Sequence, residues 1–357
     1  MSDSNPGEID YVIIGQGLAG SVLAWQLHRL GKDVLIFDNS HHMASSTVAS
    51  GLLNPVTGQR LHADEKVHEY LRCSAEIYRD MATDLSQALF YPLPMRRFAG
   101  NTKDKERYHT RRQQALYDTL IGDWCAPDNN SLLNDEYGSF EQYYCGRLDI
   151  PALLSAVKRD FVKRQRYCQQ NVSYPDIRVK ENNIQVHHIC CRHLIFCQGH
   201  QAQDNPWFPD PVWNISRGDI LHFQSDVVYP FIANYGYNYI PVAEHDFHWG
   251  SSFDPHPAQT QATFKGLQQL IAALKTFDKN TEKNTLIAQY SGLRPASRDK
   301  RPLIGFHSKQ ANVAIFNGFG ARGSLLIPYY ARHFCRVLLQ QENLQGDIDY
   351  QRFTRQV

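Results

Sequence analysis

The sequence predicts an α/β fold, in which helices alternate with the strands of a parallel sheet, and three observations near the N-terminus indicate it. Tyr11–Ile14 is a short apolar run, typical of a buried parallel strand. Ser21–Leu30 then places apolar residues at helical spacing, and Gly31 ends the helix. Asp33–Asp38 is a second apolar run that ends on an acid. Strand, helix and strand together form one βαβ unit.

Length and composition limit the class of protein further. The chain has 357 residues, which predicts two domains at roughly 100–200 residues each. A net charge of +1 and 42% hydrophobic residues exclude a disordered tail protein and a uniformly basic polyanion binder. No apolar run is long enough for a membrane span and no signal peptide is evident, so we expect a soluble cytoplasmic protein. The eight cysteines lack a CxxC spacing; we expect reduced thiols and no metal site.

The turn between the first strand and the helix carries the pattern Gly-x-Gly-x-x-Gly. In such a turn Gly15 permits the tight bend, Gly17 lets the backbone approach a pyrophosphate, and Gly20 permits close packing of helix on strand. Asp38 ends the second strand, where an acid accepts a ribose hydroxyl. The unit therefore predicts a Rossmann-like dinucleotide-binding domain, with NAD and FAD as the candidates.

The residues after this unit favour FAD. Residues 45–55 form a loop of small and hydroxyl side chains, where an NAD-binding domain usually continues into ordinary βα units. Here the sequence resembles the D-amino-acid oxidase superfamily, which includes glycine oxidase, sarcosine oxidase and D-amino-acid dehydrogenases. The resemblance implies that Ser45, Ser46 and Thr47 contact phosphate or ribityl oxygens. It also implies that residues 49–52 run beside the isoalloxazine ring.

The resemblance recurs along the chain. Val172 stands where the family reads adenine through the backbone, and residues 193–199 match the family strand that ends in a glycine at the cofactor. Residues 291–305 match its Gly-x-Arg-Pro…Asp-x-x-Pro-x-Ile-Gly signature, and the glycine-rich turn 317–324 leads into a final helix over Leu325–Gln340. Such a turn aims the positive end of a helix at the anionic edge of a reduced flavin.

The cofactor is expected to be noncovalent FAD. Val48 stands where relatives with a histidine-linked flavin carry their histidine, and residues 305–324 contain no cysteine. The residues expected to bind FAD are Gly15, Gly17, Leu18, Ala19, Gly20, Asp38, Asn39, Ser45, Ser46, Thr47, Ala49, Ser50, Gly51, Leu52, Val172, Gln198, Gly199, Arg294, Gly318, Gly320, Ala321, Arg322, Gly323 and Ser324.

The motifs imply a discontinuous architecture that is α/β in its larger domain and α+β overall. A Rossmann-like FAD-binding domain is expected to take residues 1–82, 141–216 and 292–357. A smaller substrate domain, built on a mostly antiparallel sheet, is expected to take residues 83–140 and 217–291. Short aromatic-rich segments in the second part are typical of strands, and residues 263–277 have the pattern of an amphipathic helix crossing that sheet.

Four residues are the candidates for catalysis. Arg294 lies inside the family signature, and its guanidinium fork matches the two oxygens of a substrate carboxylate. Arg322 is a second candidate for the carboxylate or for the flavin. Tyr239, as a tyrosine of the corresponding strand does in relatives, or Tyr237 is expected to add a hydroxyl. The implied reaction oxidises the C–N bond of an amino acid or N-substituted glycine by hydride transfer to flavin N5, followed by imine hydrolysis.

Two alternatives remain open. Arg-Pro-Ala-Ser-Arg-Asp at 294–299 and Gly-Ala-Arg-Gly at 320–323 most resemble the oxidase half of bifunctional enzymes that remove a carboxymethyl group from a wobble-uridine amine of tRNA. Residues 96–112 hold seven basic and two acidic side chains with interleaved aromatics, a composition suited to phosphate contacts or to a solvated helix face. The other alternative is a flavin-binding protein without a catalytic role. A small amine or amino acid is the primary substrate expected, and tRNA the secondary one.

Overall fold

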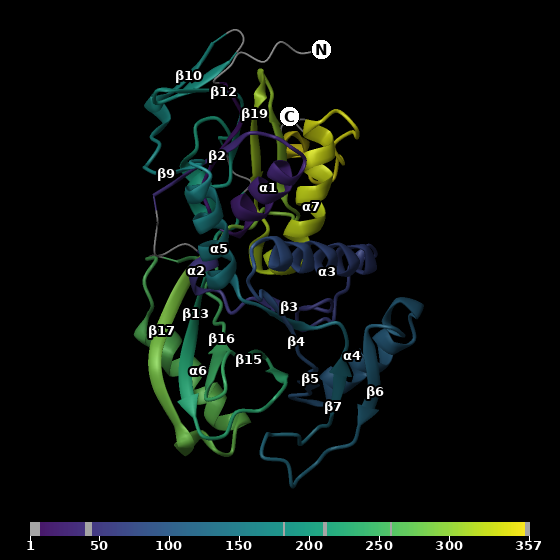
Figure 1. Cartoon of the computed structure of the whole chain (residues 1–357). Coiled ribbons are helices and arrows are strands. Elements are labelled where there is room, and N and C mark those ends of the chain that lie inside the picture. Colours follow the sequence, from purple (N-terminus) through teal and green to yellow (C-terminus); the bar gives the residue numbers. More distant parts are fainter. Residues whose placement is uncertain (1–7, 40–44, 181–182, 210–212, 258, 354–357) are drawn as a thin grey trace.

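A computed structural model describes residues 8–39, 45–180, 183–209, 213–257 and 259–353. Its upper part in Figure 1 is an eight-stranded sheet with a parallel centre, in which β12 pairs with β1, β1 with β2, and β2 with β9. The strands of this sheet are β1 (Ile9–Ile14), β2 (Val34–Asp38), β9 (Tyr167–Gln169), β10 (Ile177–Val179), β11 (Ile184–Val186), β12 (Ile189–Phe196), β18 (Leu303–His307) and β19 (Gln310–Asn317). The predicted first βαβ unit is thus confirmed, because β1 and β2 lie parallel and adjacent.

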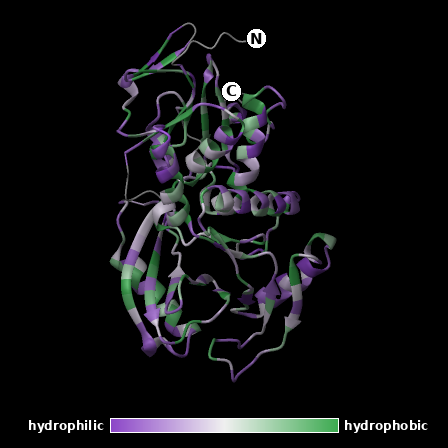
Figure 2. Cartoon of the chain, viewed as in Figure 1, coloured by the Kyte–Doolittle hydropathy of each residue, from purple (hydrophilic) through white to green (hydrophobic). Residues whose placement is uncertain are grey.

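Four helices pack together beside this sheet and share one apolar core with it. They are α1 (Leu18–Arg29), α3 (Val67–Asp84), α5 (Ile150–Lys163) and α7 (Gly323–Leu338). The first of them is buried along most of its length, whereas α3 is amphipathic and lies across the middle of the molecule. Figure 2 shows hydrophilic and hydrophobic residues interspersed along α3. The final helix begins two residues before the expected start, at Gly323.

The lower part of the molecule is a second eight-stranded sheet, ordered β17-β13-β16-β15-β14-β5-β7-β6. All its neighbours are antiparallel except β14 and β5, which run parallel. Its strands are β5 (Met95–Phe98), β6 (Ile121–Cys125), β7 (Ser139–Gln142), β13 (Ser216–Ser225), β14 (Ile232–Tyr235), β15 (Tyr237–Pro241), β16 (Asp246–Gly250) and β17 (Asn284–Arg294). The expected amphipathic helix is confirmed as α6 (Phe264–Phe277), which Thr263 caps by accepting the Gly266 amide. Its apolar side packs on one face of the sheet.

Short elements connect the two large sheets. A three-stranded sheet is formed by β3 (Leu52–Leu53), β8 (Gly146–Leu148) and β4 (Phe90–Pro92). The one-turn helix α2 (Ser45–Val48) lies against β17, and α4 (Thr102–Arg112) follows β5. The mixed fold with a mostly antiparallel second sheet is as predicted, while the exact domain boundaries stay a prediction. Within the described ranges, no helix has the length and apolar character that a membrane crossing requires.

Candidate active site

One large cavity, of about 1070 Å³, extends from the ends of β1 and β2 to the face of the second sheet that is turned away from α6. Segments far apart in the sequence meet around it. Of the residues expected to bind FAD, those lining the cavity are Gly15, Gly17, Leu18, Ala19, Asp38, Asn39, Ser45, Ser46, Ala49, Ser50, Gly51, Leu52, Val172, Gln198, Gly199, Arg294, Gly318, Gly320, Ala321, Arg322, Gly323 and Ser324.

Gly20 and Thr47 lie outside the cavity wall. The close approach expected of Gly20 is confirmed, because a Cβ atom there would lie 2.0 Å from the carbonyl oxygen of Gly15. Thr47 is exposed and does not line the cavity, so its expected contact with phosphate or ribityl oxygens stays a prediction. The helix α2 presents Ser45, Ser46 and Val48 to the cavity.

The dinucleotide end of the cavity has the features that a pyrophosphate and a ribose require. The amide N–H of Leu18, at the start of α1, donates to Ser46 Oγ at 3.0 Å. A helix N-terminus with a hydroxyl beside it is a favourable site for a phosphate oxygen. Asp38 Oδ1 accepts the amide N–H of Gln16 at 2.9 Å, which orients the carboxylate at the end of β2. These residues fit FAD and would hold its phosphates and adenosine ribose.

Two segments frame the position expected for the isoalloxazine ring. On one side, Ser45 Oγ donates to the carbonyl oxygen of Leu293, which ties α2 to the end of β17. On the other side, the glycine-rich turn is held by the amide of Gly320, which donates to the carbonyl oxygen of Pro295 at 2.9 Å. That turn leads directly into the N-terminus of α7. Both segments therefore converge where β17 ends at Arg294.

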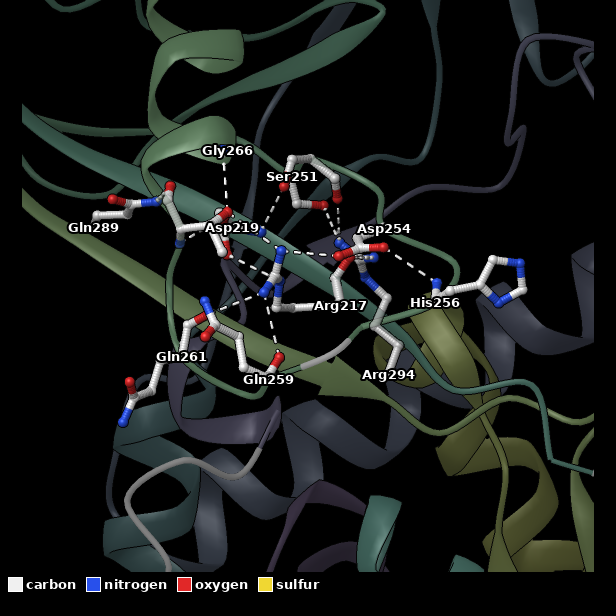
Figure 3. Close-up of polar contacts among 12 residues, drawn as sticks. Arg217, Asp219, Ser251, Asp254, His256, Gln259, Gln261, Gly266, Gln289 and Arg294 are labelled. Atoms are coloured by element: carbon white, nitrogen blue, oxygen red, sulfur yellow. Dashed lines mark hydrogen bonds and ion pairs between the residues drawn. The ribbon is translucent and has the colours of Figure 1, made fainter.

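Arg294 is held at this convergence by neutral acceptors. Its Nη2 donates to Ser251 Oγ at 2.5 Å and to the carbonyl oxygen of Ser252 at 3.1 Å (Figure 3). Its Nη1 donates to the carbonyl oxygen of Arg217 at 3.3 Å. The guanidinium lies directly against the backbone of β13, because a Cβ atom at Gly218 would lie 1.7 Å from Nη2. Burial lowers the pKa of Arg294, and the charge has no carboxylate among these hydrogen-bond acceptors.

A second arginine, Arg217, supports Arg294 from the opposite face of β13. Arg217 Nη2 donates to Asp254 Oδ2 at 2.9 Å and to Thr263 Oγ1 at 3.2 Å, and its Nη1 donates to backbone oxygens of the same loop (Figure 3). Asp219 accepts from Thr263, and its own amide donates to Ser252 Oγ at 2.9 Å. This network fastens the loop that follows β16 to the sheet, and so fixes the oxygens that receive Arg294.

The two tyrosines expected to contribute a hydroxyl lie outside the cavity. Tyr239 is fully buried in the core under α6, where its hydroxyl accepts the amide N–H of Tyr229 at 3.1 Å. Tyr237 lies on the same face of β15, and its hydroxyl accepts from Gln269 at 2.6 Å. This corrects the expectation, and the physical reason is strand alternation. Asn238, the residue between them, and Ile240 line the cavity instead.

Residues 96–112 divide between internal ion pairs and the cavity. Arg96 pairs with Asp135 at 3.3 Å, and Arg112 pairs with Asp118. Arg111 donates to the carbonyl oxygen of Arg60. Many of these charges are therefore engaged within the protein, which weakens the argument for a phosphate-binding patch. Three others, Arg97, Lys103 and Arg107, line the far end of the cavity. Their contribution to the cavity was not predicted, although all three belong to the basic stretch 96–112 described from the sequence.

A family model described as FAD-dependent oxidoreductase (DAO) matches residues 10–337. The chain belongs to this family. Among solved structures, glycine oxidase from Bacillus cereus ATCC 14579 is 18% identical with a TM-score of 0.79, and the match covers 94% of this chain and 96% of that one. Iminodiacetate oxidase from Chelativorans sp. BNC1 has the same values. L-proline dehydrogenase from P. horikoshii is 13% identical, with a TM-score of 0.79 and 99% of each chain covered.

This FAD-dependent oxidoreductase thus combines a dinucleotide-binding sheet with a second sheet that faces the flavin position. Its cavity is rich in cations, since its basic lining residues are Arg97, Lys103, Arg107, Arg294, Lys300 and Arg322, against the acids Asp38 and Asp104. Arg322 donates to the carbonyl oxygen of Lys300 at 3.3 Å. Among the described residues there is no group of three or more His, Cys, Asp or Glu side chains arranged for a metal ion. The cavity chemistry therefore favours an anionic organic ligand beside FAD.

Proposed function

We propose that this FAD-dependent oxidoreductase oxidises the C–N bond of a small carboxylated amine, either an amino acid or an N-substituted glycine. The observation that carries the proposal is Arg294, a largely buried guanidinium beside the flavin-binding segments whose hydrogen bonds go to neutral oxygens. Asp219 acts on this charge only through space, and a buried charge without a hydrogen-bonded counter-ion is costly, so a substrate carboxylate would offset that cost. The fold neighbours named glycine oxidase and iminodiacetate oxidase support the same substrate class.

The chain's own residues supply binding and orientation. Arg294 would take the carboxylate in a forked pair of hydrogen bonds, and its rigid seat on Gly218 would place the adjoining carbon. Arg322 would add a second cation at the start of α7. Bound FAD would accept a hydride from that carbon while the nitrogen loses a proton, and water would then split the imine into a carbonyl compound and an amine. Asn238 would offer its amide to the polar part of the substrate.

Anaerobic reduction of the bound flavin tests the proposal. Glycine, sarcosine and the D- and L-amino acids are mixed with the holoprotein, with ethylamine as the matched amine without a carboxylate and tRNA as a separate arm. We expect a carboxylated amine to bleach the flavin, and Arg294→Leu to lower kcat/KM for it about 100-fold, since two charge-assisted hydrogen bonds are lost. A flavin that no amine reduces would indicate a non-catalytic protein. Reduction by tRNA alone would support the other alternative.

A further inference from the structure

The cavity continues beyond Arg294 along the second sheet, where one row of residues crosses five strands. Arg97 on β5 pairs with Asn234 on β14, and Asn234 pairs with Asn238 on β15. Asn238 pairs with Gly250 on β16, and Gly250 with Ile220 on β13. Directly opposed residues of neighbouring strands share one face of a sheet, and all five line the cavity. The row therefore forms a continuous floor that leads away from the flavin position.

The part of this floor on β5, β14 and β15 is polar, and the floor reaches β16 beside Ser251, the partner of Arg294. Asn234 Nδ2 donates to Asn238 Oδ1 at 2.8 Å and to the carbonyl oxygen of Tyr237 at 3.2 Å. Ser251 follows Gly250 directly and accepts from Arg294. Three strand spacings separate β5 from β16, so the two backbones lie about 14 Å apart. Long arginine side chains at both ends of the floor shorten the span that a ligand would have to bridge.

The far end of the floor carries excess positive charge. Arg97 Nη2 donates to the carbonyl oxygen of Gly58 at 2.6 Å, which is a neutral acceptor. Asp104, the acid that acts on Arg97 electrostatically, is paired with Arg107 at 2.7 Å. Lys103 lines the same end of the cavity. Three cations thus face one carboxylate, and burial lowers the pKa of Arg97 to about 10. An anion would compensate this charge.

We propose that the substrate is a diacid: a carboxylated amine whose first carboxylate binds Arg294 and whose second anionic group, several bonds away, binds Arg97. This inference rests on the proposed function, because it takes Arg294 as the site of the first carboxylate. The two asparagines between the arginines would hydrogen-bond the polar linker. A monoacid would leave the charge of Arg97 without a bound anion. The second acid would therefore let the enzyme distinguish diacids from monoacids, with Arg97 as the residue that binds it.

Two substrates that differ only in the second acid test this inference. N-(4-carboxybutyl)glycine and N-pentylglycine have chains of equal length, and kcat/KM for each is measured with the holoenzyme. We expect the wild-type enzyme to prefer the diacid at least tenfold and Arg97→Gln to lower that preference about tenfold. Arg97→Lys should keep part of it, because the charge remains. Lys105→Gln is the matched control, since Lys105 lies over Trp124 and does not line the cavity; it should keep the wild-type preference.

A binding measurement gives a readout that does not depend on turnover. Perturbation of the flavin absorbance reports the dissociation constants of adipate and valerate, which cannot be oxidised at a C–N bond. We expect adipate to bind at least tenfold more tightly than valerate in the wild type, and less so in Arg97→Gln. Equal binding, or a preference that survives Arg97→Gln in a folded protein, overturns the inference. If monoacids are oxidised without any dependence on Arg97, the proposed function stands; if no carboxylated amine reduces the flavin, the proposed function itself fails.

Discussion

A single methyl group added at Gly218 should disable the carboxylate site while leaving Arg294 in the sequence. The Cβ atom of Gly218→Ala would lie 1.7 Å from Arg294 Nη2 and 2.4 Å from its Cζ. Favourable contacts between such atoms need roughly 3.5 Å, so the guanidinium has to move by about 1.5–2 Å. A movement of that size breaks the hydrogen bonds to Ser251 and Ser252.

The expected loss follows from this displacement. A misplacement of about 1 Å in a positioning group can cost about 100-fold in rate, which is about 2.7 kcal/mol in transition-state free energy. We therefore expect Gly218→Ala to lower kcat/KM for a carboxylated amine about 100-fold, measured by steady-state oxidation with the FAD-loaded protein. Flavin content and the thermal midpoint of the same preparation show whether the fold is intact.

Gly346→Ala is the matched control, because a Cβ atom at Gly346 meets nothing within 4 Å. This variant should keep the wild-type kcat/KM. If Gly218→Ala is folded, binds FAD and retains kcat/KM within about threefold, the seat of Arg294 on β13 does not position the substrate, and the assignment of Arg294 to the carboxylate loses its geometric support.

Three further predictions concern the cofactor, the corrected tyrosine and pH. Asp38→Ala should weaken FAD binding about tenfold, measured as the dissociation constant of FAD, because it removes the acceptor for the ribose; unchanged affinity would contradict that role. Tyr239→Phe should keep kcat/KM within about twofold and lower the free energy of unfolding by about 1 kcal/mol, since the Tyr229 amide loses its acceptor. A large loss of activity would show that this hydroxyl does act in the active site. Burial lowers the pKa of His248 from 6.5 to about 4, so the folded state binds fewer protons than the unfolded state between these values. Above pH 6.5 the imidazole is neutral in both states, whereas towards pH 4 protonation of the unfolded state lowers the free energy of unfolding. His248→Gln should reduce this pH dependence by up to about 1.4 kcal/mol per pH unit in denaturant titrations; an unchanged slope would refute this.

Local sequence was sufficient to predict an element and its role wherever the residues of the motif lie close together in the chain. The first βαβ unit was predicted because the glycines, the apolar runs and Asp38 are all set by short-range spacing. The helix ending at Phe277 was predicted within one residue at its start, because its apolar period and its Thr263 cap are local. The glycine-rich turn before α7 was predicted for the same reason.

The face on which a side chain lies was not predictable for β15. Tyr237, Asn238 and Tyr239 are all able to hydrogen-bond, so alternation along the strand does not indicate which of the two alternating sets of side chains faces the cavity. The packing of α6 decides it, because this helix covers the face with the two tyrosines. That helix lies more than twenty residues further along the chain. The expectation for Tyr239 failed for this reason, although its strand was placed correctly.

By itself, the sequence determined the nucleotide-binding unit, the class of cofactor and the presence of Arg294 in the family signature. Only the tertiary structure decided which residues lie across the cavity from that arginine. Arg97 and Asn234 are 137 positions apart, yet their strands run parallel and place both on one cavity floor. Register between distant strands depends on the packing of whole sheets and not on any local pattern. The local cluster of positive charge seen in the sequence thus separates into ion pairs within the protein and one wall of the cavity.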